Sequence, residues 1–192
     1  MGQKTQNKIV YGTFNDIKPL SLSSATFHYE YLPPILTVTS LRREIEISHW
    51  GNNLAVEEHY ALTHHGAKMD QEFNRVKYQL ASHVSDQTNV LEKLVFKLPK
   101  EAKDIYYRDE VGNVSTSNFR NEKHISTLEI RPRFPLFGGW KTTWYMGYNV
   151  PLKNFLRYAK GRYMLKVLFV ENVQSMVIDD TELKVILPEG AK

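Results

Sequence analysis

The chain has 192 residues, of which 42% are hydrophobic and 12% are aromatic, and this composition excludes an intrinsically disordered chain. It predicts one domain, or one domain with part of another, that buries a core without disulfides. The absence of cysteine excludes zinc–thiolate sites, thiol catalysis and disulfide scaffolds. The 25 basic and 21 acidic residues are interspersed, and the best basic sites, Arg42-Arg43 and Arg131 with Arg133, are only pairs, so we predict no nucleic-acid partner.

Two signals that would fix the cellular location are missing from the sequence. No segment approaches the roughly 20 apolar residues that span a bilayer. The first residues also lack the apolar stretch of a secretory signal peptide. Two interpretations stay open on composition alone, a cytosolic protein and a piece of a larger protein.

The chain divides near its first prolines. Residues 1–34 are polar, weakly patterned and end at Pro33-Pro34, which indicates a loop. We therefore interpret residues 1–34 as a lead-in segment, either a linker or the end of a preceding domain. Residues 35–192 are expected to form the folded domain.

Apolar and polar residues alternate in many short segments of this second part. In residues 43–50, for example, Ile45, Ile47 and His49 lie on one face of the expected strand, as in a half-buried antiparallel sheet. Gly51-Asn52-Asn53 predicts the turn that follows. The full set of expected strands is 35–39, 43–50, 54–62, 90–98, 104–108, 126–131, 142–150, 163–170, 175–178 and 183–187.

Helical signals are few. Residues 69–78 fit a helical turn or a strand, and only residues 152–160 read as a short helix. Many short strands with turn residues between them are typical of an antiparallel sandwich or barrel. We predict an all-β fold, an antiparallel β-sandwich with at most one short helix.

The most unusual stretch is 131–151, which contains three prolines, three glycines and six aromatic residues. Its prolines predict an extended arm, Gly138-Gly139 predicts a reversal, and a return strand is expected after Trp140. The aromatic side chains of Trp140, Trp144 and Tyr148 are candidates for contact with a partner or a glycan. The alternative, which alternation along a sandwich strand favours, is that such residues fill the core.

No pattern of catalytic or metal-binding residues emerges. His59, His64 and His65 lie near two glutamates but lack the His-Glu-x-x-His spacing of a zinc protease. The acidic pairs Asp109-Glu110 and Asp179-Asp180 fall at expected turns, where solvated carboxylates are common. The Gly-x-Ser-x-Gly elbow and the phosphate-binding glycine loops do not occur. We predict no catalytic site, no metal and no cofactor in this chain.

One modification motif is present. Asn113-Val114-Ser115 is an N-glycosylation sequon in a polar stretch beside a glycine, as expected of a surface acceptor. The motif has a use only in a chain that enters the secretory lumen.

Four longer motifs are distinctive. They are YYRDEVGNVST at 106–116, EIRPRFPLFGGWKT at 129–142, EISHWGN at 46–52 and ILPEGAK at 186–192. These motifs resemble the ribophorin I family, whose members are subunits of the eukaryotic oligosaccharyltransferase complex. The resemblance extends from about residue 35 to the end, although residues 61–98 contain no distinctive family motif.

The resemblance implies a lumenal fragment of a single-pass type I protein of the endoplasmic reticulum membrane, built of β-rich domains. It implies a non-catalytic subunit that supports protein N-glycosylation through complex assembly and substrate presentation. The implied partners are the other subunits, including the polytopic catalytic one, and nascent glycoproteins. It also implies a lumenal setting for Asn113. A glycan- or peptide-binding module that uses exposed aromatic residues is the alternative function.

Overall fold

A computed structural model describes residues 3–5, 8–10, 14–21, 26, 29–48, 50–82, 88–170, 172–173 and 176–191. The chain forms two compact units, Met1–Glu30 and Tyr31–Lys192. The first unit contains two short antiparallel strands, β1 (Gln3–Thr5) and β2 (Lys8–Val10). The second unit contains all other elements and carries the features described below.

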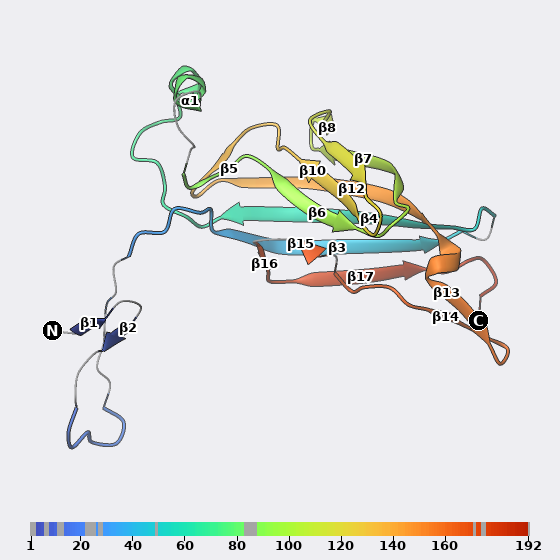
Figure 1. The fold of residues 1–192 in the computed structure, drawn as a ribbon, viewed down its shortest axis with the longest axis horizontal. Helices are drawn as coiled ribbons and strands as arrows, with labels where there is room; N and C mark the ends of the chain where they lie inside the picture. The colour runs from blue at the N-terminus through green and yellow to red at the C-terminus, as the bar shows by residue number, and fades with distance from the viewer. Residues whose placement is uncertain are drawn as a thin grey trace. The chain divides into compact units, whose positions relative to one another are not determined.

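A seven-stranded sheet forms the base of the second unit (Figure 1). Its strands follow the order β16-β3-β4-β12-β7-β8, and β17 also pairs with β3. Both β16 and β17 run parallel to β3, whereas the other pairs are antiparallel. The strands are β3 (Leu36–Ile47), β4 (Asn53–His64), β7 (Lys103–Asp109), β8 (Gly112–Asn113), β12 (Lys141–Pro151), β16 (Met176–Ile178) and β17 (Thr181–Ile186).

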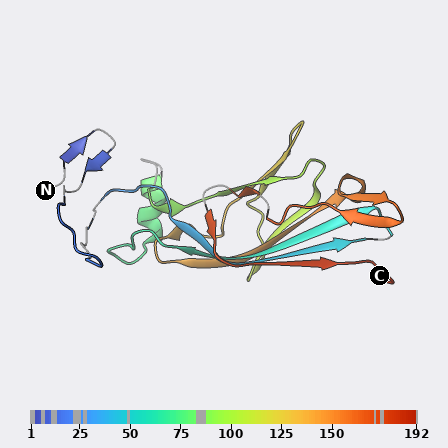
Figure 2. The same ribbon diagram turned by 90° about the horizontal axis from the view of Figure 1, so that it is seen from below.

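A second, four-stranded antiparallel sheet lies against the inner face of the first (Figure 2). The aromatic rings of Tyr60 on β4 and Phe96 on β6 meet across the two layers, with centroids 5.6 Å apart. One continuous apolar core joins the layers. The second sheet follows the order β15-β6-β10-β9 and comprises β6 (Leu94–Leu98), β9 (Asn118–Asn121), β10 (Ser126–Ile130) and β15 (Asn172–Val173).

The alternation of the sequence explains why these strands form a sandwich. In β4 every second residue is buried from Leu54 to His64, while Ala55, Glu57 and the residues that alternate with them face outward. Because successive side chains of a strand point to opposite faces, one face of β4 lines the core. The predicted all-β sandwich is confirmed, although the parallel pairing of β16 and β17 was not expected. His49, placed on the buried face by its spacing, lies outside the described residues.

Smaller elements complete the second unit. The strands β5 (Val90–Leu91) and β11 (Leu136–Phe137) pair with each other, as do β13 (Leu156–Ala159) and β14 (Arg162–Leu165). The only regular helix of the described residues is α1 (Arg75–Ser82), where the Asn74 side chain accepts a hydrogen bond from the Lys77 amide at 3.0 Å. The helical option for residues 69–78 is therefore correct only from Arg75 onward, and residues 69–74 are irregular.

The helix expected over residues 152–160 is wrong beyond its first turn. A single 3-10 turn, η1 (Leu152–Asn154), is followed by the β13–β14 hairpin. Lys160 and Gly161 both have positive φ, 52° and 76°, and they reverse the chain tightly. The strand expected over residues 163–170 accordingly ends at Leu165, because β14 is only as long as its hairpin partner.

The reversal and the return strand predicted for residues 131–151 are present, whereas the arm expected to be extended bends at Arg133 and Phe134. Gly139 has a φ of +83°, and its amide donates to the carbonyl of His64 at 2.7 Å. A Cβ on Gly138 would lie 2.0 Å from the carbonyl oxygen of Ala67, so only glycine fits this close approach. Within the described part of the chain, no helix is long and apolar enough to cross a bilayer.

Candidate functional site on the outer face of the sheet

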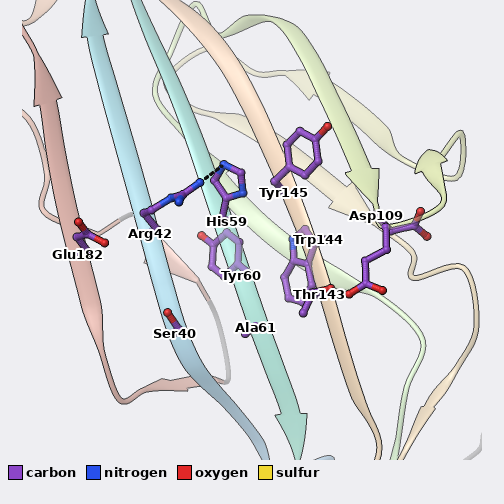
Figure 3. Close-up of a pocket in the computed structure, with 11 residues that line it drawn as sticks. Ser40, Arg42, His59, Tyr60, Ala61, Asp109, Thr143, Trp144, Tyr145 and Glu182 are labelled. Atoms are coloured by element: carbon purple, nitrogen blue, oxygen red, sulfur yellow. Dashed lines mark hydrogen bonds between the residues drawn. The ribbon is translucent and has the colours of Figure 1, made fainter.

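A shallow open groove of about 540 Å³ lies on the outer face of the seven-stranded sheet (Figure 3). Its lining comes from β3, β4, β12 and β17 and from the turn after β7. Arg42, His59 and Tyr145 project into it from three neighbouring strands. Outward residues line the groove because they occupy the positions that alternate with the core residues of the same strands.

His59 is the centre of a polar network at this groove. Its Nε2 lies 2.7 Å from Glu57 Oε1, and its ring stacks on Tyr145 with centroids 5.1 Å apart. The Arg42 guanidinium lies 3.4 Å from the same Nε2. Arginine can only donate a hydrogen bond and an ionised carboxylate can only accept one. Nε2 of His59 would have to accept from Arg42 but donate to Glu57, and it cannot do both at once. The shorter contact places the Nε2 proton toward Glu57.

Glu57 also accepts a hydrogen bond from the Tyr106 hydroxyl at 2.5 Å. Partial burial works against ionisation of Glu57, but the hydrogen bonds from Tyr106 and His59 outweigh it and hold its pKa below the usual value. Burial, reinforced by the hydrogen bond to Glu57, raises the pKa of Tyr106. Tyr106 thus stays a neutral donor and Glu57 an ionised acceptor.

The groove offers hydrogen-bond donors, acceptors and aromatic ring edges. Glu182 on β17 and Glu110 in the turn after β7 are exposed carboxylates at its rim, and Glu110 accepts a hydrogen bond from the Thr143 hydroxyl at 2.6 Å. Among the residues that the structure describes, no group of three histidine or acidic side chains is placed to hold a metal ion. The arrangement suits binding of a polar ligand or partner by complementary hydrogen bonds.

The sequon residue Asn113 lies at the end of a tight turn next to this groove. Asp109 Oδ1 accepts hydrogen bonds from the amides of Val111 and Gly112, each at 3.0 Å, and so shapes the β7–β8 turn. Asn113 is exposed, and its Oδ1 accepts a hydrogen bond from Arg108 Nε at 2.7 Å. The bond uses the side-chain oxygen, whereas a glycan attaches to the nitrogen.

The proline-rich arm fixes this turn through Arg133. Its guanidinium forms a two-pronged ion pair with Asp109, with Nε–Oδ2 at 2.6 Å and Nη2–Oδ1 at 2.8 Å. The hydrogen bonds from Arg133 hold the pKa of Asp109 below its usual value. Arg133 Nη2 also approaches the carbonyl oxygen of Asn113 at 3.4 Å. The arm therefore positions the segment that carries the sequon.

Comparison with known proteins decides the family. A model of the family described as ribophorin I matches residues 2–192. The chain belongs to the ribophorin I family. The resemblance seen in the four sequence motifs is thereby confirmed.

The relatives of this ribophorin I chain include one animal protein and two plant proteins. It is 43% identical over 192 residues to "Dolichyl-diphosphooligosaccharide--protein glycosyltransferase subunit 1" of Caenorhabditis elegans, covering 99% of this chain and 32% of that protein. It is 40% identical to subunit 1B of Oryza sativa subsp. japonica, covering 96% and 39%, and 41% identical to subunit 1B of Arabidopsis thaliana, covering 96% and 40%. The chain thus spans between about a third and two fifths of the length of these relatives.

The structural likenesses are weak. An M1 zinc metallopeptidase of Deinococcus radiodurans aligns with a TM-score of 0.35 and 12% identity, over 59% of this chain and 20% of that one. A two-domain M1 zinc metallopeptidase gives the same score at 10% identity, over 63% and 22%. At this TM-score the likeness carries no argument about the ribophorin I chain.

Of the three aromatic residues predicted to contact a partner or a glycan, Trp144 and Tyr148 lie in the core. Only 4% of Trp144 and 2% of Tyr148 is exposed, and Trp144 stacks on Tyr60 with centroids 4.9 Å apart. Both side chains point inward because they occupy the core-facing positions of β12. A glycan or peptide contact requires exposed aromatic residues, and these two are buried. They fill the core, as the alternative interpretation of the sequence proposed.

Trp140 differs from these two residues. It is half-buried and forms edge-to-face contacts with Phe73 and Phe137, with centroids 5.5 and 5.4 Å apart. Phe134, which is exposed, meets the same ring at 6.1 Å. A partner or glycan contact by Trp140 stays a prediction.

The histidines and acidic pairs do not assemble into one site. His64 is buried, its Nδ1 accepts a hydrogen bond from the Gly66 amide at 2.9 Å, and burial lowers its pKa. His65 is exposed, and only His59 joins the outer network. Asp179-Asp180 is exposed but does not form the predicted turn, because it joins β16 to β17, and both strands run along β3 in the same direction. Sequence reasoning missed the Asp109–Arg133 pair, for which the only signal was an arginine between two prolines.

Proposed function

We propose that this chain is a lumenal domain of a non-catalytic subunit of the oligosaccharyltransferase complex, supporting protein N-glycosylation through complex assembly and substrate presentation. The observation that carries the proposal is the family match over residues 2–192, together with relatives named as subunit 1 of the glycosyltransferase. In this proposal residues 1–34 lead in from a preceding lumenal segment, and residues 35–192 form the working domain.

The proposal assigns the chemistry to another, polytopic subunit. The partners of this chain are then that subunit, the other members of the complex and nascent glycoproteins at the lumenal side of the endoplasmic reticulum membrane. The parent protein is a single-pass type I membrane protein. The outer groove supports a role in substrate presentation. Arg42 offers a positive charge, Glu182 a negative charge and His59 a polar ring to a polar segment of a nascent glycoprotein.

The test is a replacement experiment. Cells that depend on a version of the protein lacking residues 31–192 are compared with cells that carry the whole protein. We expect reduced glycosylation of some acceptors in a panel, or loss of the intact complex on a native gel. Unchanged glycosylation of every acceptor together with intact assembly would overturn the proposal.

We also propose that Asn113 carries an N-linked glycan. Its exposure on a turn and the use of only its oxygen by Arg108 leave the nitrogen side open to modification. When the protein is expressed through the secretory pathway, a glycosidase-sensitive mass shift is expected, and Asn113→Gln should remove it. Ser115→Ala should do the same without changing Asn113. No shift in the parent protein would contradict the assignment.

A further inference from the structure

The positive charge of the chain is concentrated in one segment. Residues 151–170 contain five basic residues and no acidic residue, whereas the rest of the chain contains 20 basic and 21 acidic residues. The net charge of +4 therefore originates in this segment alone. It covers η1, the β13–β14 hairpin and the residues that follow, and its basic residues are Lys153, Arg157, Lys160, Arg162 and Lys166.

All five basic side chains are exposed, and none of them forms an ion pair with a described residue. Elsewhere in the second unit Arg42, Arg43, Arg131 and Arg133 each have a carboxylate partner. Like charges gathered without counter-ions repel one another, which is unfavourable for the isolated fold. The repulsion is relieved when an anionic surface binds.

The turn at the tip of the hairpin contains a lysine whose backbone conformation is unfavourable for a bulky residue. Lys160 and Gly161 form the two central positions of the turn, both with positive φ. Such turns favour Asn-Gly, because residues with a bulky side chain are strained in the left-handed region. Lys160 therefore places a charge at the outermost point of the hairpin despite the preference of the backbone.

Aromatic residues accompany the charges. Tyr158 and Tyr163 face each other across the hairpin with ring centroids 4.8 Å apart, and 66% and 72% of these side chains are exposed. Trp50, which is 90% exposed, belongs to the β3–β4 turn. A hydrogen bond of 3.0 Å from the Leu152 amide to the Asn52 carbonyl joins that turn to η1, so Trp50 and the hairpin share one end of the sheet (Figures 1 and 2).

Together these residues define one end of the unit, which we call the basic end, comprising the five basic residues with Trp50, Tyr158 and Tyr163. Tyr158 and Tyr163 occupy one face of the hairpin and Arg157 and Arg162 the other, because side chains alternate along each strand. Tyrosine and tryptophan rings favour the boundary between lipid and water, and lysine and arginine are attracted to anionic headgroups. Met164 on β14, of which 54% is exposed, adds apolar area to the hairpin.

We propose that the basic end docks on the surface of an anionic phospholipid membrane. The aromatic side chains would lie at headgroup level and the basic side chains would neutralise lipid phosphates and carboxylates. The β13–β14 hairpin projects from the end of the sheet (Figure 1) and carries the paired Tyr158 and Tyr163 rings, which suits a deformable membrane better than the preformed groove of an acidic protein. The inference rests on this surface alone and does not depend on the proposed subunit role.

The experiment is vesicle flotation with the whole chain. The probes are vesicles of phosphatidylcholine alone and vesicles of phosphatidylcholine with phosphatidylserine. We expect flotation with the anionic vesicles only, and weaker flotation as salt rises, because salt screens exposed charges. Each neutralised Lys or Arg should lower the partition coefficient about five-fold, so Arg157→Gln, Lys160→Gln and Arg162→Gln together should lower it about a hundred-fold.

A matched control removes three charges from other surfaces. Lys103→Gln, Lys123→Gln and Lys141→Gln change exposed lysines outside the basic end by the same total charge. This variant should bind within about five-fold of the parent chain, since only long-range attraction is reduced. Circular dichroism and the thermal midpoint of both variants should match the parent, which shows that loss of binding is not loss of fold.

Several outcomes would overturn the proposal. Equal flotation with neutral and anionic vesicles would show that charge is not recognised. Equal losses in the two triple variants would show that net charge, not the basic end, directs binding. Competition by soluble inorganic diphosphate would indicate a phosphate site in place of a membrane surface. Absence of flotation would leave an acidic protein as the partner and reject the membrane.

Discussion

Two neighbouring positions on β3 and two on β4 build charged clusters on opposite faces of one sheet. Arg43 and Glu58 point inward and form an ion pair of 2.9 Å that is almost fully buried. Arg42 and Glu57 point outward and meet at His59, where water reaches the side chains. The same residue types, one step apart in the sequence, are therefore placed in two different dielectric environments.

Tyrosines supply hydrogen bonds to the inner cluster. The Tyr60 hydroxyl donates to Glu58 Oε2 at 2.8 Å, and Arg43 Nη2 donates to the Tyr148 hydroxyl at 3.4 Å. Burial, together with the charge of Glu58, raises the pKa of Tyr60 well above its usual value. A charge inside the core depends on its partner because water cannot replace it, whereas a charge outside is solvated and screened. The two faces should therefore respond very differently to the same substitution.

The largest effect is expected from Glu58→Gln. It removes the carboxylate charge that pairs with the buried Arg43 guanidinium, which costs about 3–5 kcal/mol of the free energy of unfolding. The matched substitution Glu57→Gln on the outer face should cost less than about 1 kcal/mol. Urea denaturation of both variants measures the difference. Equal losses would mean that the two faces are not energetically distinct.

A smaller effect is expected where the outer face is closely packed. A Cβ on Gly147 would lie 2.2 Å from the Tyr106 ring, so Gly147→Ala pushes away the ring that donates to Glu57. Overpacking of this kind costs about 1–3 kcal/mol. Tyr106→Phe, which removes only the hydroxyl, should cost about 1 kcal/mol or less.

Combining Gly147→Ala with Tyr106→Ala tests the cause of that effect. The smaller side chain removes the clash, so the double variant should lose less stability than the two single variants added together. Simple additivity in denaturation would show that the Tyr106 ring is not the group that Gly147 accommodates.

The pH dependence of Glu57 should be weak and have a defined sign. Because its pKa is lower in the folded protein than in the unfolded chain, its contribution is complete above the usual glutamate pKa of about 4.3 and is lost as pH falls through the folded value. The stability difference between the parent and Glu57→Gln should therefore shrink below about pH 4. A difference that grows on acidification would contradict the assigned hydrogen bonds.

The smallest change in stability is expected from Arg133→Lys. Lysine keeps the charge but not the planar two-pronged contact with Asp109, so stability should fall by less than about 1 kcal/mol. The pKa of the Asp109 carboxyl should rise toward its usual value, as measured by NMR titration. Amide exchange at Val111 and Gly112 should also become faster. An unchanged Asp109 pKa would show that the arm does not hold the turn.

Alternation along single strands was the part of the fold that the sequence revealed. The pattern around Ile45 and Ile47, and the return through β4, predicts both strands and their buried faces. The direction of β16 and β17 beside β3 was not predictable, because strands far apart in sequence carry no local signal of how they pair. The apolar residues after Leu165 suggested a longer strand because hydrophobicity alone does not show whether a partner strand is present.

The candidate site was less predictable than the fold. Trp144 and Tyr148 were identified as contact candidates by their type, yet the alternation that contains them already favoured the core. The Asp109–Arg133 pair joins residues that no periodic pattern connects, and it requires the folded arm. His59 was recognised as a histidine near acidic residues, but its neighbour Tyr145 comes from another strand and depends on the register of β4 with β12.

Affinity purification of the protein from detergent-solubilised endoplasmic reticulum membranes tests the proposed subunit role most directly. Quantitative mass spectrometry then measures which proteins are recovered with it. We expect the oligosaccharyltransferase subunits, including the polytopic catalytic subunit, to co-purify with it in near-equal amounts. Recovery of the protein without them, while those subunits remain in the unbound fraction, would contradict it.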